Sequence, residues 1–203
     1  MSRKPITLAL LTALSIATAG CGVADYGQAP GTVQITELVA SSGAGSLAFG
    51  GYLHSDVVTN VTKNNVTTAT RFNDVGRVTF SLILKDPGAP GITNVPSAQN
   101  EVQLTHYRVV YRRTDGRNVQ GVDVPYSFDS GMTILVPATG SGQQTFDIVR
   151  VSAKLEAPLL ALASNGDSLD MIADVTFYGR DMHGNNVAVT GSIGVTFANF
   201  GDA

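Results

Sequence analysis

Three histidines are the side chains best suited to acid–base chemistry, and His54 stands beside Ser55 and Asp56. These are the residue types of a serine-hydrolase triad, in which histidine takes the serine proton and an acid orients the histidine. Neighbours on a strand point to opposite faces, so adjacency in sequence does not assemble a triad. His106 and His183 lie in no spacing typical of a zinc protease. A hydrolase is therefore a remote alternative, and we expect no catalytic residues.

Acidic and glycine-rich segments offer two further kinds of site. Four aspartates carry oxygens of the kind calcium prefers but match no twelve-residue calcium loop; they are Asp167, Asp170, Asp174 and Asp181. Asp170 and Asp174 lie ~13 Å apart along a strand, at ~3.3 Å per residue. The stretch 42–46 precedes a strand and lacks the lysine of a phosphate loop. We expect solvated carboxylates and a flexible loop, with no metal and no cofactor; a calcium site is the alternative.

Four arginines form the basic cluster of the chain: Arg108, Arg112, Arg113 and Arg117. Arg108 and Arg112 project to the same strand face, where guanidinium groups could bind phosphate, an acidic glycan or a protein. Such a row also occurs as a solvated sheet face whose charge resists edge pairing. We expect the solvated face and assign no binding residue, and an acidic partner is the alternative.

The composition excludes several classes of protein. The 203 residues include one Cys and no Trp, and by count only three Glu and four Lys, so a helical bundle, a disulfide-stapled fold and a Cys-rich metal site are excluded. A hydrophobic fraction of 43% is too high for a disordered chain. The net charge of −3 argues against a nucleic-acid partner.

The N-terminus has the layout of a secretory signal peptide over residues 1–20. A basic start is followed by an uncharged, mostly apolar run over 6–17 and by small residues up to Gly20. As a helix, twelve residues reach roughly 18 Å, short of the ~30 Å hydrocarbon core. A permanent membrane-spanning helix is therefore the weaker interpretation.

The end of this segment, Thr18-Ala19-Gly20-Cys21, resembles the lipobox of bacterial lipoproteins, with Thr18 where that family usually has Leu, Val or Ile. The resemblance implies that Cys21 becomes the lipidated first residue. It also implies the outer membrane, because Gly22 replaces the Asp that retains lipoproteins in the inner one. Ordinary cleavage after Ala19 is the alternative, since Ala17 and Ala19 fit the small-x-small rule.

Lipidation would fix the mature chain to a membrane. Three acyl chains give effectively permanent attachment, because each buried methylene contributes ~0.8 kcal/mol. Residues 21–31 then form the lipidated Cys and a flexible tether, with roughly 16–19 Å of reach over ten residues. Loss of Arg3 and Lys4 leaves 11 basic against 16 acidic residues, a net charge of −5. This sign disfavours electrostatic docking to anionic lipids or nucleic acid.

Period-two alternation predicts strands through most of the mature chain. The clearest pair is 169–180 and 187–198, joined by a hairpin turn over 181–185. Further strands are expected at 32–39, 46–58, 78–85, 102–111, 132–136 and 146–151. A phase slip near Thr105 and His106 predicts a β-bulge. Residues 60–70 form a loop or an exposed hairpin around Asn64 and Asn65.

One short helix is expected within 154–163, where Leu155, Leu159 and Leu162 follow helical spacing and Pro158 is tolerated in a first turn. It should cross between two sheets. Nine or so short strands with turn-rich spacing predict an all-β fold, an antiparallel sandwich that forms one enlarged domain over 32–203. The block 167–200, with its 179–185 hairpin, resembles bacterial immunoglobulin-like and fibronectin-type-III-like domains. That resemblance implies an immunoglobulin-like sandwich and no particular function.

These features predict a non-enzymatic lipoprotein of the bacterial cell envelope with a structural, adhesive or assembly role. Its partners would be the membrane, through the lipid anchor, and an envelope protein. The alternative is an extracellular ligand- or carbohydrate-binding module. Such sandwiches stack exposed aromatics on a sugar, so this alternative requires an exposed cluster of Tyr107, Tyr111 and Tyr126.

Overall fold

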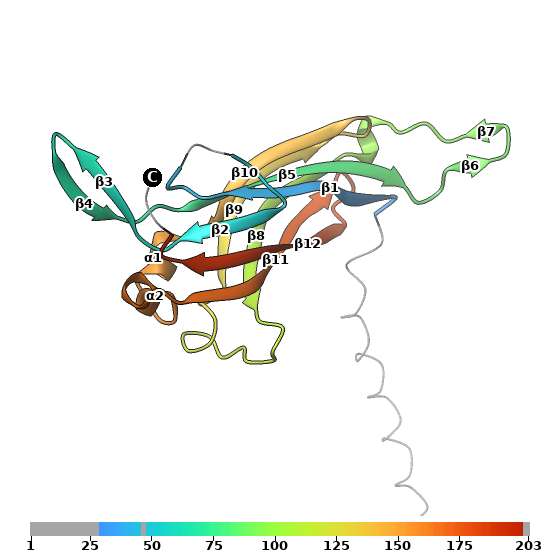
Figure 1. Cartoon of the computed structure of the whole chain (residues 1–203). Helices are drawn as coiled ribbons and strands as arrows, with labels where there is room; N and C mark the ends of the chain where they lie inside the picture. The colour runs from blue at the N-terminus through green and yellow to red at the C-terminus, as the bar shows by residue number, and fades with distance from the viewer. Residues whose placement is uncertain (1–28, 46–47, 201–203) are drawn as a thin grey trace, which may run out of the picture.

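The chain folds into two packed β-sheets (Figure 1). The computed structural model describes residues 29–45 and 48–200, so the signal peptide, Cys21 and most of the predicted tether lie outside the described residues. The smaller sheet has the order β1 (Gly31–Ser41), β5 (Asp74–Leu84), β10 (Ser141–Val149). The larger has the order β2 (Tyr52–Asp56), β12 (Asn186–Ala198), β11 (Ser168–Asp181), β8 (Val102–Arg112), β9 (Phe128–Val136). The all-β sandwich is confirmed, and its immunoglobulin-like kind stays a prediction.

The core forms where the alternating faces of both sheets meet. Phe80 of β5 and Phe177 of β11 are fully buried and pack edge to face, with ring centroids 5.0 Å apart. Val175, Val195 and Phe197 are also fully buried, and Leu82 is partly buried against the same cluster. The period-two pattern therefore predicts which face of these strands turns inward. Pairing of β11 with β12 is antiparallel, whereas β12 pairs with β2 in parallel.

The predicted β-bulge is present in β8. The pairing register shifts between Leu104 and His106 opposite β9, and between Tyr178 and Gly179 opposite β11. Gly179 lies so close to β8 that a Cβ there would come within 2.0 Å of the Gln103 carbonyl oxygen. A glycine is required at this approach, because any side chain would collide with backbone.

The helical segment differs from the single helix predicted over 154–163. Two short helices, α1 (Val151–Lys154) and α2 (Leu159–Asn165), connect β10 with β11 and so cross between the sheets as expected. Pro158 has no N–H to donate to the carbonyl of Lys154, so one helix cannot run through it. Leu159 and Leu162 are buried, whereas Leu155 is 50% exposed at the end of α1. The strand expected to reach 151 ends at Val149 because the chain turns into α1 there.

Two hairpins project from opposite ends of the sandwich (Figure 1). The first consists of β3 (Thr59–Lys63) and β4 (Val66–Thr70), and Asn64 and Asn65 at its tip have positive φ, as a tight turn requires. The second consists of β6 (Gly88–Ala89) and β7 (Ile92–Thr93), followed by the 3₁₀ turn η1 (Ala98–Asn100). We call residues 87–100 the arm. The exposed hairpin expected over 60–70 is confirmed.

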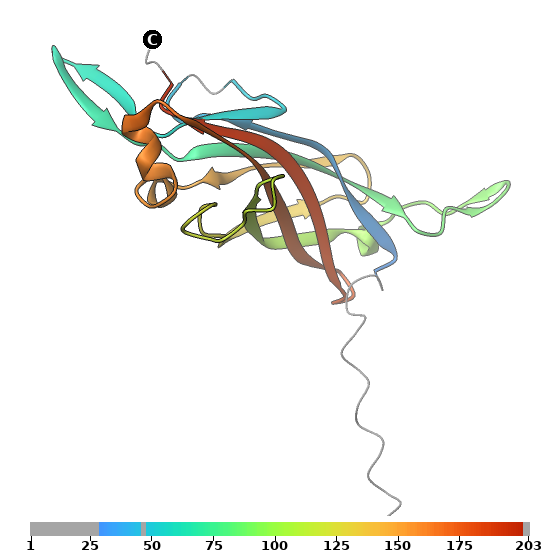
Figure 2. The ribbon, with the colours of Figure 1, turned by 60° about the horizontal axis from the view of Figure 1, so that its bottom comes forward.

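The start of β1 marks one end of the molecule, which we call the tether end. Gly31 pairs with Leu84, the last residue of β5 before the arm. Figures 1 and 2 place this start of β1 beside the β11–β12 turn, and the arm extends beyond it in both views. The β3–β4 hairpin, both helices and the end of β12 lie at the opposite end. In the described part of the chain, no helix has the length and apolarity needed to cross a bilayer.

Candidate functional site

The triad residue types do not come together. His54 is exposed and contacts the rings of Tyr52 and Phe200, with centroids 5.3 and 5.7 Å away. Ser55 points to the opposite face, where its hydroxyl is fully buried and donates to Asp74 at 2.6 Å. The Asp56 carboxylate accepts hydrogen bonds from the Thr59 hydroxyl and the backbone of Phe200. Strand alternation therefore separates His54 from Ser55, as expected for neighbours on a strand.

Ser55 belongs instead to a buried polar cluster that the sequence does not reveal. The Lys154 ammonium donates to Asp74 at 2.9 Å and to the Asp56 carbonyl oxygen at 2.7 Å. The backbone N–H of Gly43 donates to the Asp74 carboxylate at 3.0 Å. Burial raises the pKa of Asp74, and Lys154, Ser55 and Gly43 oppose that rise. Because Ser55, Asp74 and Lys154 are fully buried, the cluster links β2, β5 and α1 and offers no access to a substrate.

The four aspartates considered for calcium each have separate partners. Asp174 binds Arg112 and Ser192, and Asp170 accepts from Thr196. Asp167 is bonded to Asn165, outside the strands. Over residues 29–45 and 48–200, no three carboxylate, histidine or cysteine side chains gather as a metal site would require.

Asp181 organises the β11–β12 turn. Its carboxylate accepts from the backbone N–H groups of His183 and Asn185, at 2.9 and 2.8 Å, and from the Asn185 amide at 2.7 Å. Burial works to raise the pKa of Asp181, but these hydrogen bonds and the nearby His183 ring outweigh it and hold the pKa below its ordinary value. The His183 side chain is exposed, as expected for a turn residue.

Arg108 and Arg112 lie on the solvent face of β8, and aspartates of this chain pair with all four arginines of the cluster. Arg108 lies 3.6 Å from Asp129, and Arg112 lies 2.6 Å from Asp174. Arg113 and Arg117 both contact Asp115, at 2.6 and 3.0 Å. These internal pairs reduce the positive potential that an acidic partner would meet.

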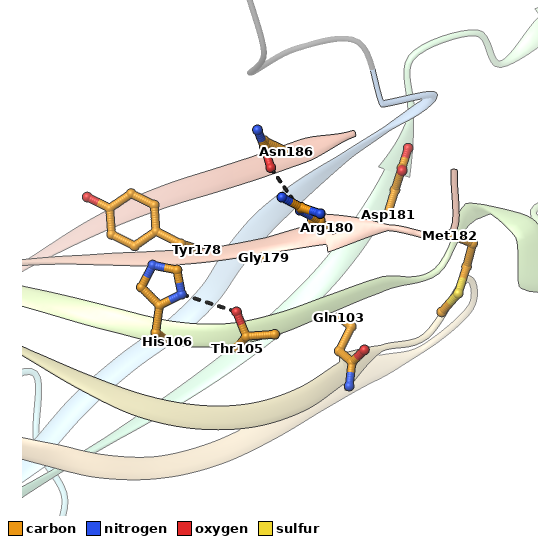
Figure 3. Close-up of a pocket in the computed structure, with 9 residues that line it drawn as sticks. All are labelled: Gln103, Thr105, His106, Tyr178, Gly179, Arg180, Asp181, Met182 and Asn186. Atoms are coloured by element: carbon orange, nitrogen blue, oxygen red, sulfur yellow. Dashed lines mark hydrogen bonds between the residues drawn. The ribbon is translucent and has the colours of Figure 1, made fainter. Parts of the chain in front are cut away.

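A pocket of about 400 Å³ opens on the outer face of the large sheet at the bulge (Figure 3). Its lining comes from β8, β11, the following turn and the start of β12: Gln103, Thr105, His106, Tyr178, Gly179, Arg180, Asp181, Met182 and Asn186. It lies at the tether end, beside the β11–β12 turn. The bulge is what makes room, because Thr105 adds a residue to β8 between Leu104 and His106.

Two flat rings and one guanidinium give the pocket its chemistry. The His106 and Tyr178 rings stack with centroids 4.9 Å apart and planes 12° apart, and the His106 Nδ1 lies 3.1 Å from the Thr105 hydroxyl. Arg180 donates from Nε to the Asn186 side-chain oxygen at 3.1 Å. No ion pair among the described residues involves Arg180, so its guanidinium is available to an anionic or hydroxyl-rich molecule.

Tyr107, Tyr111 and Tyr126 do not form the exposed cluster that the carbohydrate-binding alternative requires. Tyr107 and Tyr111 are buried, and their hydroxyls donate to the backbone oxygens of Asp147 and Ile148 on the facing sheet. Burial raises the pKa of both phenols. Only Tyr126 of the three is exposed. The phase slip at the bulge turns Tyr107 and Tyr111 inward and leaves His106 outside.

Comparisons with protein-family models, with curated proteins and with solved structures found no match.

Proposed function

We propose that this chain is a non-enzymatic lipoprotein of the bacterial cell envelope, held at the outer membrane through Cys21 and acting in structure, adhesion or assembly. The observation that carries the proposal is how closely the folded domain follows the signal. The buried residue Ala29 and the first described strand at Gly31 come eight and ten positions after Cys21. A lipidated Cys21 would therefore hold the sandwich near the bilayer.

The arrangement of polar groups supports a role other than catalysis. The cluster of Ser55, Asp74 and Lys154 is sealed from solvent, and His54 lies on the other face of the strand that carries Ser55. A substrate would have to reach a fully buried hydroxyl, which the packed core prevents.

The test is membrane fractionation of cells that express the full chain. Cys21→Ser should release the protein from the membrane fraction, because the thiol that would carry the lipid is removed. Gly22→Asp is the matched control: the lipoprotein sorting rule predicts that it stays membrane-bound and moves to the inner membrane on a density gradient. Equal retention of wild type and Cys21→Ser would refute the proposal.

A second candidate function is the binding of an acidic sugar in the pocket at the bulge. The observation that favours it is the stacked His106–Tyr178 pair beside an arginine without a carboxylate partner among the described residues. A ring face can pack on a sugar, and a guanidinium can hold its carboxylate by two parallel hydrogen bonds.

Proton NMR tests this candidate with galacturonate as the acidic probe and galactose as the neutral match. Galacturonate should shift the ring resonances of His106 and Tyr178. Arg180→Gln should weaken binding by about tenfold or more, since a hydrogen bond to a charged group contributes ~1.5–3 kcal/mol. Ring resonances that do not move with either sugar would eliminate this candidate.

A further inference from the structure

The arm carries the two most exposed large hydrophobic side chains of the residues that the structure describes. Val95 is 79% exposed and Ile92 is 75% exposed. No charged residue occurs over residues 87–100, although the chain as a whole is acidic. An uncharged projection that exposes two aliphatic side chains is unfavourable in water unless something covers it.

Part of the arm's backbone is satisfied by hydrogen bonds within the arm and its base, without water. Gly88 pairs with Thr93 and Ala89 with Ile92 in a short antiparallel ladder. The backbone of Asn94 donates to the Pro87 carbonyl, and its side-chain amide donates to the Asp86 carbonyl. A segment that satisfies part of its backbone internally loses less when it leaves water for an apolar boundary.

The position of the arm indicates what covers it. It extends past the start of β1, at the end of the sandwich where the chain from Cys21 enters (Figures 1 and 2). Three more exposed hydrophobic side chains lie at this end, in β5, β9 and the β11–β12 turn: Ile83, Leu135 and Met182. Tethering at this end places all of these groups within reach of the bilayer.

We propose that the arm is a second membrane contact, in which Ile92 and Val95 enter the boundary between headgroups and acyl chains. The inference rests on the proposed anchoring at Cys21. The anchor makes arm insertion intramolecular, so a weak apolar contact is enough to stay engaged. The contact is apolar because the mature chain, at net charge −5, gains little from anionic headgroups. It fixes the orientation of a domain that the tether alone would leave free to turn.

The sequence supplies an unusually clean probe, because it has no Trp and its only Cys is Cys21. The mature chain, residues 21–203, is coupled through Cys21 to maleimide lipid in vesicles of phosphatidylethanolamine and phosphatidylglycerol. This coupling does not depend on lipidation in the cell, so a failure of the anchor proposal and a failure of the arm proposal are distinguishable. Ile92→Trp and Val95→Trp are the arm reporters. Val66→Trp, in the hairpin at the opposite end and 64% exposed, is the matched control reporter.

Brominated acyl chains should quench the fluorescence of both arm reporters at least threefold more strongly than that of the control reporter. The emission of the two arm reporters should also be blue-shifted. Equal, weak quenching of all three variants would overturn the proposal. A blue shift at the arm without quenching by brominated lipid would also overturn it, because the arm would then be covered by protein, either a partner or a second copy of the chain.

Discussion

Lys154 occupies a position where an ammonium group is costly, because it is fully buried between the sheets. The free-energy cost of burying the ammonium group is offset by hydrogen bonds to the Asp74 carboxylate and to the Asp56 carbonyl oxygen. Removing one member of such a pair leaves an uncompensated buried charge. The cluster therefore stabilises the fold only while it is complete.

We predict that Lys154→Met lowers the free energy of unfolding by ~3–5 kcal/mol, because Asp74 loses its buried counter-charge. Urea unfolding measures the change. Lys63→Met, at an exposed position of β3, is the control and should have a small effect. Adding Asp74→Leu to Lys154→Met should recover part of the loss. A single-variant loss below about 1 kcal/mol would contradict the ion pair.

Asp181 gives a prediction about pH. Its folded pKa lies below its ordinary value, so the carboxylate stabilises the fold above the unfolded pKa of ~3.9 and loses this contribution as pH falls through the folded pKa. Asp181→Asn should therefore cost ~1.5–3 kcal/mol at pH 7, and the difference from wild type should narrow below about pH 4. Parallel stability curves for the two proteins from pH 7 to pH 3 would disprove this role.

At the residue scale, the sequence predicts the position of a side chain where the local strand or turn determines it. It does not predict positions where the partners of the side chain come from other elements. The solvated position of His183 follows from its turn. The pairing of Ser55 with Asp74 and Lys154 joins three separate elements, and no local pattern contains it. The pocket at the bulge is not predicted for the same reason. The sequence predicts an irregularity at Thr105 and His106, but only the pairing of β8 with β11 brings Tyr178 and Arg180 beside it.

Among the elements, β11 contributes the aromatic side chain that joins the two sheets, Phe177. Phe177 touches the rings of Phe80, Tyr107 and Phe146, at 5.0, 6.1 and 5.3 Å between centroids. It therefore joins strands of both sheets. The period-two pattern predicts its inward direction, and the structure adds that aromatic packing, rather than aliphatic packing alone, fills this part of the core.

Phe177→Ala should reduce the free energy of unfolding by ~3–5 kcal/mol through lost burial and the cavity left behind. Such a loss is a large part of the ~5–15 kcal/mol typical of a domain. Denaturant unfolding provides the measurement, with Thr133→Ala on the exposed face of β9 as the control. A change in the Phe177 variant as small as in the control would show that the aromatic cluster does not hold the sheets together.

Elements with a strong local signal are predicted from the sequence: the 169–198 hairpin, the bulge and the Asn64–Asn65 turn. The location of the helical crossover is predicted correctly, but the number of helices in it is not. Leucine spacing indicates one helix, whereas the missing N–H of Pro158 divides it into α1 and α2. The parallel pairing of β2 with β12 has no local signal at all, because it joins strands that lie far apart in the sequence.

On the scale of the whole molecule, variants of Arg108 and Arg112 can test whether the surface charge of the protein recruits a partner. Arg108 and Arg112 are already paired with Asp129 and Asp174. We therefore expect an Arg108→Ser/Arg112→Ser double variant to recover the same envelope proteins as wild type after crosslinking, at about 0.1 M and about 1 M salt. A partner lost by the variant at low salt and by wild type at high salt would show that the row binds, since salt screens exposed charges.

The parallel β2–β12 pair has a consequence for the order of events during synthesis. The last described strand lies inside the large sheet, between β2 and β11, and not at its edge. A chain that emerges N-terminus first cannot complete this sheet until β12 is available, so β2 waits for a partner that is made much later. Because the large sheet closes late, the polypeptide can still pass through a pore as an extended chain while it is being made. If the chain is exported unfolded, as its predicted signal peptide implies, the large sheet would become complete only after β12 had crossed the membrane.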